Sequence, residues 1–211
     1  MPQLPLVTLQ GSHARLEPLS SDHVDALTSA AEGPRGTFAM TFVPRDRAET
    51  RAYVDAALEA HAAGDALPFA IVSVALNVVV GSTRFGTVER WIWPADHASC
   101  AADRTPDAVE IGWTWLAEEA QRTAINTEVK RLMLGHAFET WRVHRVSLIT
   151  DVRNARSCAA IERIGATREG MRRAHFPAAD GTLRDSALYS IIAAEWPDVR
   201  ARLDEMLSRC R

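Results

Sequence analysis

A change of hydrophobic period within residues 109–141 constrains the fold of this chain more than any other feature. Over residues 109–115 apolar and polar residues alternate, and this period of two is typical of a half-buried β-strand. We expect one face of that strand to carry Val109, Ile111, Trp113 and Trp115. From Asn126 onward the apolar residues recur at intervals of three and four, which indicates an amphipathic helix. Its two apolar rows are Val129, Met133 and Ala137, and Leu134, Phe138 and Trp141.

The turn between this strand and this helix, residues 121–126, is short and polar and carries Arg122. The first N–H groups of a helix have no intrahelical partners, and with the helix dipole they favour an anion such as phosphate. Asn126 suits the N-cap position and Glu128 the first turn. Since Glu128 would repel a nearby phosphate, Arg122 and Lys130 would have to offset its charge. The alternative is an ordinary connection without a ligand, which the spacing alone favours.

A second strand and helix follow at residues 144–150 and 154–164, and Gly165 is a typical C′ glycine. Gly81 indicates a bulge or a close backbone approach, and Asp180-Gly181 indicates a hairpin turn. The pattern predicts further elements at residues 7–19 (a strand or hairpin), 22–31 and 46–63 (helices), 68–75 and 78–88 (paired strands), 168–176 and 183–193 (strands) and 195–210 (a helix).

The order and spacing of several segments resemble those of the GNAT family of acyl-CoA-dependent N-acetyltransferases, specifically the ribosomal-protein N-acetyltransferase branch. The matching segments are Glu110-Ile111-Gly112-Trp113, the loop before Asn126, Asn154-x-x-Ser157, Gly165-Ala166, Arg168-Glu169-Gly170, Leu183-Arg184-Asp185 and Glu195-Trp196. The resemblance implies one α/β (α+β) domain over residues 1–211. Its mixed, mostly antiparallel sheet of about seven strands would be flanked by helices and splayed between its two middle parallel strands.

The resemblance also implies where acetyl-CoA, the co-substrate, would bind. The backbone of Trp115 and Leu116 would pair with the pantetheine arm, and Asn154 would contact the far side of that arm. The pyrophosphate would be held by Arg122, Thr123, Ala124, Ile125, Asn126 and Thr127. The family loop usually reads Gln/Arg-x-x-Gly-x-Gly/Ala, whereas this one has Ala124 and Asn126 at the last two of those positions. The Cβ of Ala124 would crowd the anion slightly.

The chemistry implied is direct attack of a primary amine on the thioester. Glu110 is the candidate general base, since burial would raise its pKa toward a useful value; the alternative is an ion pair with an arginine on a neighbouring strand. Family members often protonate the sulfur with a tyrosine at the position that Ile161 holds here. Ser157 is therefore the candidate donor to sulfur, and the alternative is a first-turn serine that bonds the helix backbone.

Four aromatic residues are candidates for the acceptor site. Phe38 and Phe42 lie between the first two helices, where the resemblance implies a roof over the acceptor; the alternative is core packing. Trp91 and Trp93 lie in a long segment without a clear period, either as a plug on the sheet edge or as a wall of the substrate pocket. The acceptor would be a peptide N-terminus or a small-molecule amine. A rival role is a non-catalytic module of the same fold that senses acyl-CoA or binds a partner.

Composition narrows the classes of function. A net charge of −3 and a pI near 6.2 argue against nucleic-acid binding through phosphate contacts. The three cysteines have no metal-ligand spacing and indicate reduced thiols, as in the cytoplasm. No apolar run is long enough to span a membrane, and no secretory signal is evident. We therefore expect a cytoplasmic enzyme with no metal, nucleic-acid or membrane partner; a homodimer stays open.

Overall fold

The structure is a computed structural model and describes residues 2–94 and 106–210. Within these residues eight strands form one sheet in the order β1-β2-β3-β4-β5-β6-β8-β7. The strands are β1 (Leu9–Gln10), β2 (Ala14–Pro18), β3 (Leu67–Ser73), β4 (Val78–Glu89), β5 (Ala108–Leu116), β6 (Arg145–Asp151), β7 (Thr167–Pro177) and β8 (Leu183–Ile192). All neighbouring pairs are antiparallel except β5 and β6. The expected mixed, mostly antiparallel sheet is confirmed.

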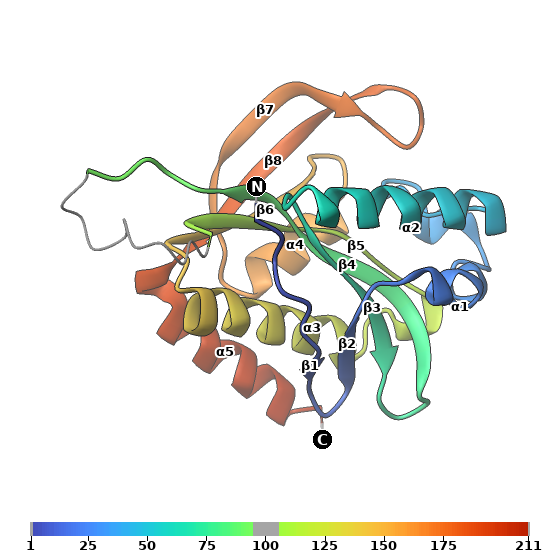
Figure 1. The fold of residues 1–211 in the computed structure, drawn as a ribbon, viewed down its shortest axis with the longest axis horizontal. Helices are drawn as coiled ribbons and strands as arrows, with labels where there is room; N and C mark the ends of the chain where they lie inside the picture. The colour runs from blue at the N-terminus through green and yellow to red at the C-terminus, as the bar shows by residue number, and fades with distance from the viewer. Residues whose placement is uncertain (1, 95–105, 211) are drawn as a thin grey trace.

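Helices cover both faces of the sheet (Figure 1). The α-helices are α1 (Val24–Ala30), α2 (Arg47–Ala62), α3 (Ala124–Gly135), α4 (Ala155–Arg163) and α5 (Trp196–Ser208). The helices α3 and α5 lie side by side on one face, whereas α1 and α2 lie on the other. A short 3-10 turn, η2 (Arg35–Phe38), lies between α1 and α2. The β7–β8 hairpin projects beyond the helices (Figure 1).

The two parallel strands at the middle of the sheet separate soon after they pair. Ala108, Val109 and Glu110 of β5 pair with residues 145–147 of β6, and the ladder stops there. Beyond Glu110 the two strands continue to residues 116 and 151 without pairing to each other. The predicted splay is therefore present, and it leaves facing strand edges between which an extended chain can make backbone hydrogen bonds.

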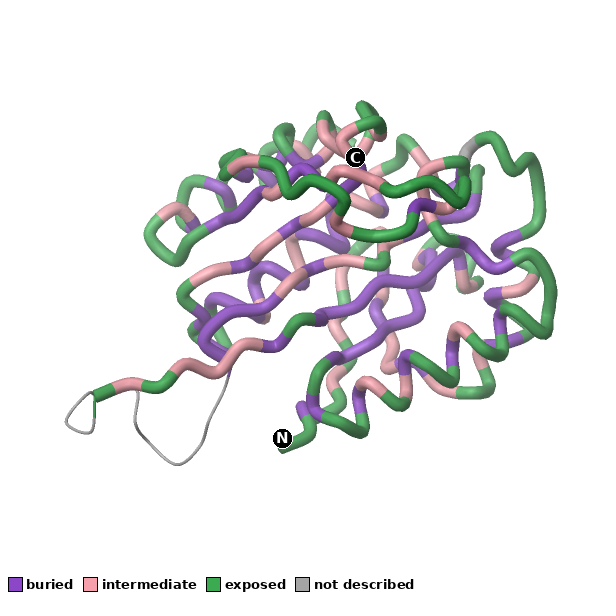
Figure 2. Tube along the Cα trace, turned by 90° about the horizontal axis from the view of Figure 1, so that it is seen from above, coloured by how far each residue is buried: buried purple, intermediate pink, exposed green. Residues whose placement is uncertain are grey.

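The core lies between the sheet and the helices, and Figure 2 shows the buried stretches running through the central strands and the inner sides of the helices. Helix α3 and the helical segment that continues it, η5 (His136–Trp141), contribute both predicted rows to this core. The buried members are Val129, Met133, Ala137, Leu134, Phe138 and Trp141. The helical period that the sequence predicted over residues 126–141 is therefore confirmed, although η5 is π-helical.

The start of α3 differs from the prediction. Thr123 is the N-cap residue, and its Oγ1 accepts a hydrogen bond from the backbone N–H of Ile125 at 3.3 Å. Asn126 lies within the first helical turn, so the prediction that it caps the helix was wrong. Both residue types are good N-caps, and the sequence alone did not separate them.

The alternation along β5 is broken by a β-bulge. Ser82 and Arg84 of β4 pair with Trp115 and Gly112 of β5, so one residue of β4 opposes two of β5. Trp113 sits in this bulge with a φ of 51°, and 46% of its surface is exposed. The prediction that it shares the buried face with Val109, Ile111 and Trp115 was therefore wrong.

Gly81 bears out the expected close backbone approach. Its φ is 156°, and a Cβ at this position would lie 2.1 Å from the carbonyl oxygen of Trp115. A larger residue would thus push β4 away from the strand that carries Glu110.

Candidate active site

The candidate active site lies where β5 and β6 separate. Glu110 belongs to the last residue pair of the parallel ladder, opposite Ser147. On its other side it pairs with Gly86 of β4. The carboxyl group is thus held at the point where the gap between the strands begins.

The surroundings of Glu110 favour a protonatable carboxyl group. Burial raises its pKa, and a hydrogen bond from the Thr87 hydroxyl together with the charge of Arg184 partly opposes that rise. The Thr87 Oγ1 donates to Glu110 Oε2 at 3.0 Å. A Cβ on Gly112 would lie 2.7 Å from Glu110 Oε1, so the glycine makes room for the carboxylate. Within the described ranges Glu110 has no salt bridge. The alternative role that the sequence allowed, an ion pair with an arginine on a neighbouring strand, is therefore not seen.

The turn before α3 presents a cation and free helix N–H groups. Arg122 has a φ of 61°, in the left-handed region, and its side chain is exposed. Thr123 Oγ1 also donates to the carbonyl of Ala120 at 2.7 Å, which fixes the turn. Because Ala124 and Asn126 occupy the first turn, their N–H groups have no intrahelical acceptor. This geometry suits a pyrophosphate.

Glu128 does not oppose an anion at this turn, contrary to the expectation from sequence. Its carboxylate is buried and accepts backbone hydrogen bonds from Ser12 at 2.9 Å, His13 at 2.5 Å and Ala14 at 2.6 Å. Lys130 does not compensate for it either. The Lys130 Nζ is buried and donates to Thr114 Oγ1 at 2.9 Å, and burial lowers its pKa to about 7.

The N-terminus of α4 faces this turn across the gap. Asn154 caps α4, because its Oδ1 accepts the backbone N–H of Ser157 at 3.0 Å. In the same turn Arg156 Nη1 donates to Gln121 Oε1 at 3.0 Å, and Gln121 Nε2 donates to the carbonyl of Leu116 at 2.9 Å. These contacts link α4, the turn before α3 and the end of β5.

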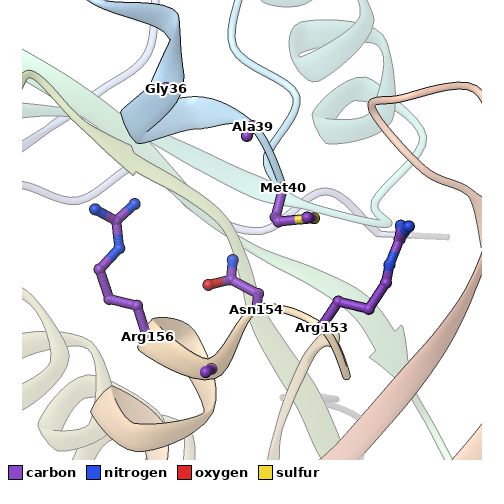
Figure 3. Close-up of a pocket in the computed structure, with 7 residues that line it drawn as sticks. Gly36, Ala39, Met40, Arg153, Asn154 and Arg156 are labelled. Atoms are coloured by element: carbon purple, nitrogen blue, oxygen red, sulfur yellow. The ribbon is translucent and has the colours of Figure 1, made fainter.

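A cavity of about 220 Å³ opens beside the α4 N-terminus. Its lining residues come from the η2 segment and from the start of α4: Gly36, Ala39, Met40, Arg153, Asn154, Ala155 and Arg156. Figure 3 shows the Asn154 amide between the side chains of Arg153 and Arg156, with Met40 opposite. The segment between α1 and α2 therefore covers this end of the gap.

Two candidate donors to a departing sulfur have different surroundings. Ser157 lies half-buried in the first turn of α4, and its hydroxyl forms no hydrogen bond to any described residue. Tyr189 reaches α4 from β8, but it is buried and donates to Glu162 Oε1 at 2.9 Å. Burial raises the pKa of Tyr189 well above its ordinary value. Ile161 packs in the core. Of the two, only Tyr189 has a hydroxyl already engaged by another described residue.

The aromatic candidates for the acceptor site divide into two groups. Phe38 is buried with its ring edge-on to Trp115, 6.5 Å between centroids, whereas 66% of Phe42 is exposed. Trp91 and Trp93 pack on His144, and their indole N–H groups donate to Glu89 and Asp107. The tryptophans thus cover the beginnings of β5 and β6, away from α4. Residues 95–105 of the same segment lie outside the described residues.

Two residues at the site, Thr87 and Arg156, were not predicted from the sequence. Thr87 has a φ of 46° beside a second register shift between β4 and β5, and no pattern in the sequence marks that irregularity. Arg156 lies inside the segment Asn154-x-x-Ser157, in which the sequence predicted a role only for Asn154 and Ser157.

No described group of three or more His, Cys, Asp or Glu side chains is arranged to hold a metal ion. No described helix has the length and hydropathy to cross a membrane.

Comparisons with known proteins agree with this geometry. The profile of the acetyltransferase (GNAT) domain matches residues 13–167. A Bacillus subtilis (strain 168) protein named "Putative ribosomal N-acetyltransferase YdaF" is 34% identical over 94 residues, which are 44% of this chain and 50% of that protein. The chain thus spans about half the length of this curated relative.

Solved structures extend the similarity to the whole fold. A GCN5-related N-acetyltransferase from Brucella melitensis superimposes with a TM-score of 0.80 at 26% identity, covering 98% of this chain and 87% of the other. RimJ of Mycobacterium smegmatis, in complex with CoA-disulfide, gives a TM-score of 0.75 at 21% identity, covering 97% and 93%, a likeness of fold. The chain belongs to the GNAT acetyltransferase family, and within it resembles the ribosomal-protein acetyltransferases.

Proposed function

We propose that this protein transfers the acetyl group of acetyl-CoA to a primary amine by direct attack, with Glu110 as the general base. The observation that carries the proposal is the half-buried Glu110 carboxyl group, which lies at the point where β5 and β6 separate and whose pKa is raised by desolvation. A base works best when its pKa approaches the working pH.

The residues around the gap divide the remaining tasks. The α3 N-terminus and Arg122 would hold the pyrophosphate, and Arg156 adds a second cation across the gap. The free edge of β5 at Trp115 and Leu116 would pair with the pantetheine arm. Asn154 at the α4 cap would contact its far side.

The reaction forms one nitrogen–carbon bond, breaks one carbon–sulfur bond and removes two protons from the nitrogen of the acceptor. Glu110, directly or through one water, takes a proton from the ammonium form of the acceptor. The neutral amine nitrogen then forms a bond to the thioester carbonyl carbon, and the carbon–sulfur bond breaks. The nitrogen gives up its second proton as the amide forms, and that proton ends on the departing sulfur, directly or through water. The leaving thiolate would accept a hydrogen bond from the Ser157 hydroxyl. No covalent acyl-enzyme is needed.

A peptide or protein N-terminus is the first candidate for the acceptor, and the name of the Bacillus subtilis relative supports it. An α-amino group also has an intrinsic pKa near ~8, against ~10.4 for lysine, so it needs less help from a base. A small-molecule amine is the second candidate.

Free thiol release tests the proposal. The protein is incubated with acetyl-CoA and peptides that carry a free or a blocked N-terminus, together with a panel of small amines. We expect thiol release in step with N-acetylation, and none with blocked peptides. Calorimetry with acetyl-CoA alone is the independent check. No binding at millimolar acetyl-CoA would overturn the proposed function, as would binding without transfer to any amine.

A further inference from the structure

Arg84 of β4 is a buried cation without an anionic partner. Only 8% of its surface is exposed, and its Nε is enclosed without any hydrogen-bond partner. Among residues 2–94 and 106–210 its side chain forms no hydrogen bond or salt bridge. Arginine is almost never buried to this degree unless it is paired.

Two aromatic rings hold the guanidinium in place. Its central carbon lies 5.2 Å from the ring centroid of Tyr53 and 4.8 Å from that of Trp113. The Tyr53 hydroxyl is anchored to Ser82 Oγ at 3.1 Å. The bulge in β5 brings Trp113 to this position, and a Cβ on Gly86 would lie 2.5 Å from the Trp113 ring. Helix α2 and both strands thus contribute to the placement of one guanidinium.

The aromatic contacts do not fully offset the burial of this charge. Each cation–π contact is individually modest, whereas the removal of a charged group from water is costly. A planar guanidinium with a fixed fork of donors is the side chain best suited to a carboxylate. No described residue supplies an anion to this guanidinium, so its partner would have to come from a bound molecule.

The register of β4 and β5 places Arg84 next to the proposed base. Arg84 pairs with Gly112, and Gly86 pairs with Glu110. Directly paired residues of antiparallel strands point to the same face, as do alternate residues of one strand. Arg84 and Glu110 therefore share the face that α2 covers, one two-residue step apart, or about 7 Å along the strand. The proposed pyrophosphate position is elsewhere, at the far end of β5.

We propose that Arg84 binds a carboxylate of the acceptor, so that the acceptor is an amine that also carries a carboxylate. The inference rests on the proposed function and specifies its substrate class. A carboxylate held by Arg84 directs the amine of the same molecule toward Glu110. The carboxylate comes either from a free amino acid or from an acidic side chain near a peptide N-terminus.

The test compares matched acceptors that differ only in charge. One pair is a free amino acid and its carboxamide; the other is a peptide with Asp or Asn as its second residue. A charge-assisted hydrogen bond is worth about 1.5–3 kcal/mol, so kcat/KM should favour the carboxylate by about 10- to 150-fold in one pair. The pair that shows the preference identifies the source of the carboxylate.

Variants then assign the preference to Arg84. In Arg84→Gln the ratio of kcat/KM for the two acceptors should fall toward one, and Arg84→Lys should keep part of it. Arg51→Gln, an exposed arginine on α2, is the matched control and should retain the wild-type ratio. Urea unfolding shows whether each variant is folded. If Arg84→Gln does not fold, the ratio of kcat/KM is measured in Arg84→Lys instead.

Binding separates this inference from the proposed function. Calorimetry with the N-acetylated amino acid or peptide, which has a carboxylate but no reactive amine, should show weaker binding to Arg84→Gln, while acetyl-CoA binds both proteins alike. Equal kcat/KM for carboxylate and carboxamide in the wild type, or a preference unchanged in Arg84→Gln, would overturn the role of Arg84. If the wild type acetylates no acceptor, the proposed function fails, and this binding difference alone decides about Arg84.

Discussion

Replacing Glu128 with alanine should destabilise the protein without weakening acetyl-CoA binding. The carboxylate accepts three backbone hydrogen bonds from the β1–β2 turn. Hydrogen bonds to a charged group contribute about 1.5–3 kcal/mol each, so about 5–9 kcal/mol is an upper limit. Water can replace the partner at exposed Ser12, but Ala14 is fully buried. We expect a loss of about 3–5 kcal/mol, a large fraction of a typical domain's stability.

Urea unfolding without acetyl-CoA measures this loss. Glu128→Gln keeps one acceptor oxygen and should lose less, and Glu59→Ala, an exposed carboxylate on α2, should change stability by under about 0.5 kcal/mol. Gly11→Ala should act in the same direction as Glu128→Ala, because its Cβ would overlap the Glu128 carboxylate. A loss below about 1 kcal/mol for Glu128→Ala, or a marked gain in acetyl-CoA affinity, would refute this assignment of Glu128 to the β1–β2 turn.

Three further predictions follow from the site and its surroundings. Arg122→Ala should raise the dissociation constant of acetyl-CoA about tenfold or more while leaving the unfolding midpoint unchanged; an unchanged constant in calorimetry would place the pyrophosphate elsewhere. Ser157→Ala should lower kcat and kcat/KM together by about tenfold, with the larger loss for thioesters of the more basic thiol, and equal losses would leave Ser157 a structural residue. Burial lowers the pKa of Lys130 to about 7. The unfolded chain therefore binds more protons from about pH 7 to about pH 10, and stability should rise with pH across that window. Lys130→Met should remove the rise, and a parallel pH dependence of its urea midpoint would contradict it.

Most of the helices and strands could be predicted from the hydrophobic periodicity of local segments. The apolar rows of residues 129–141 were predictable because every member lies in α3 or in η5, which continues it, and Val129, Met133 and Ala137 are all buried as expected. The role of Gly81 was also predicted correctly, since a close backbone approach requires a residue without a Cβ. The same local reasoning failed at Trp113, because Trp-Thr-Trp alternates whether or not a bulge shifts its phase.

The candidate site depends on contacts that local sequence does not encode. The partners of Glu128 lie more than 110 residues away in the chain, so the sequence suggested only its repulsion of a phosphate. Arg84 resembles any polar residue of a strand until Tyr53 and Trp113 are seen to enclose it. The resemblance to the GNAT family supplied Glu110 and Asn154, but not Arg156, whose contact to Gln121 bridges two loops.

The pH dependence of turnover in Glu110→Gln tests the central claim most directly. Burial raises the pKa of Glu110, so the wild-type kcat/KM should rise with pH as this carboxyl group loses its proton. Without the base the variant should be impaired most at neutral pH and should partly recover at higher pH, where the amine deprotonates by itself. Glu59→Gln should follow the wild-type profile. A loss of equal size at every pH, or no loss, would contradict the role of Glu110 as the base.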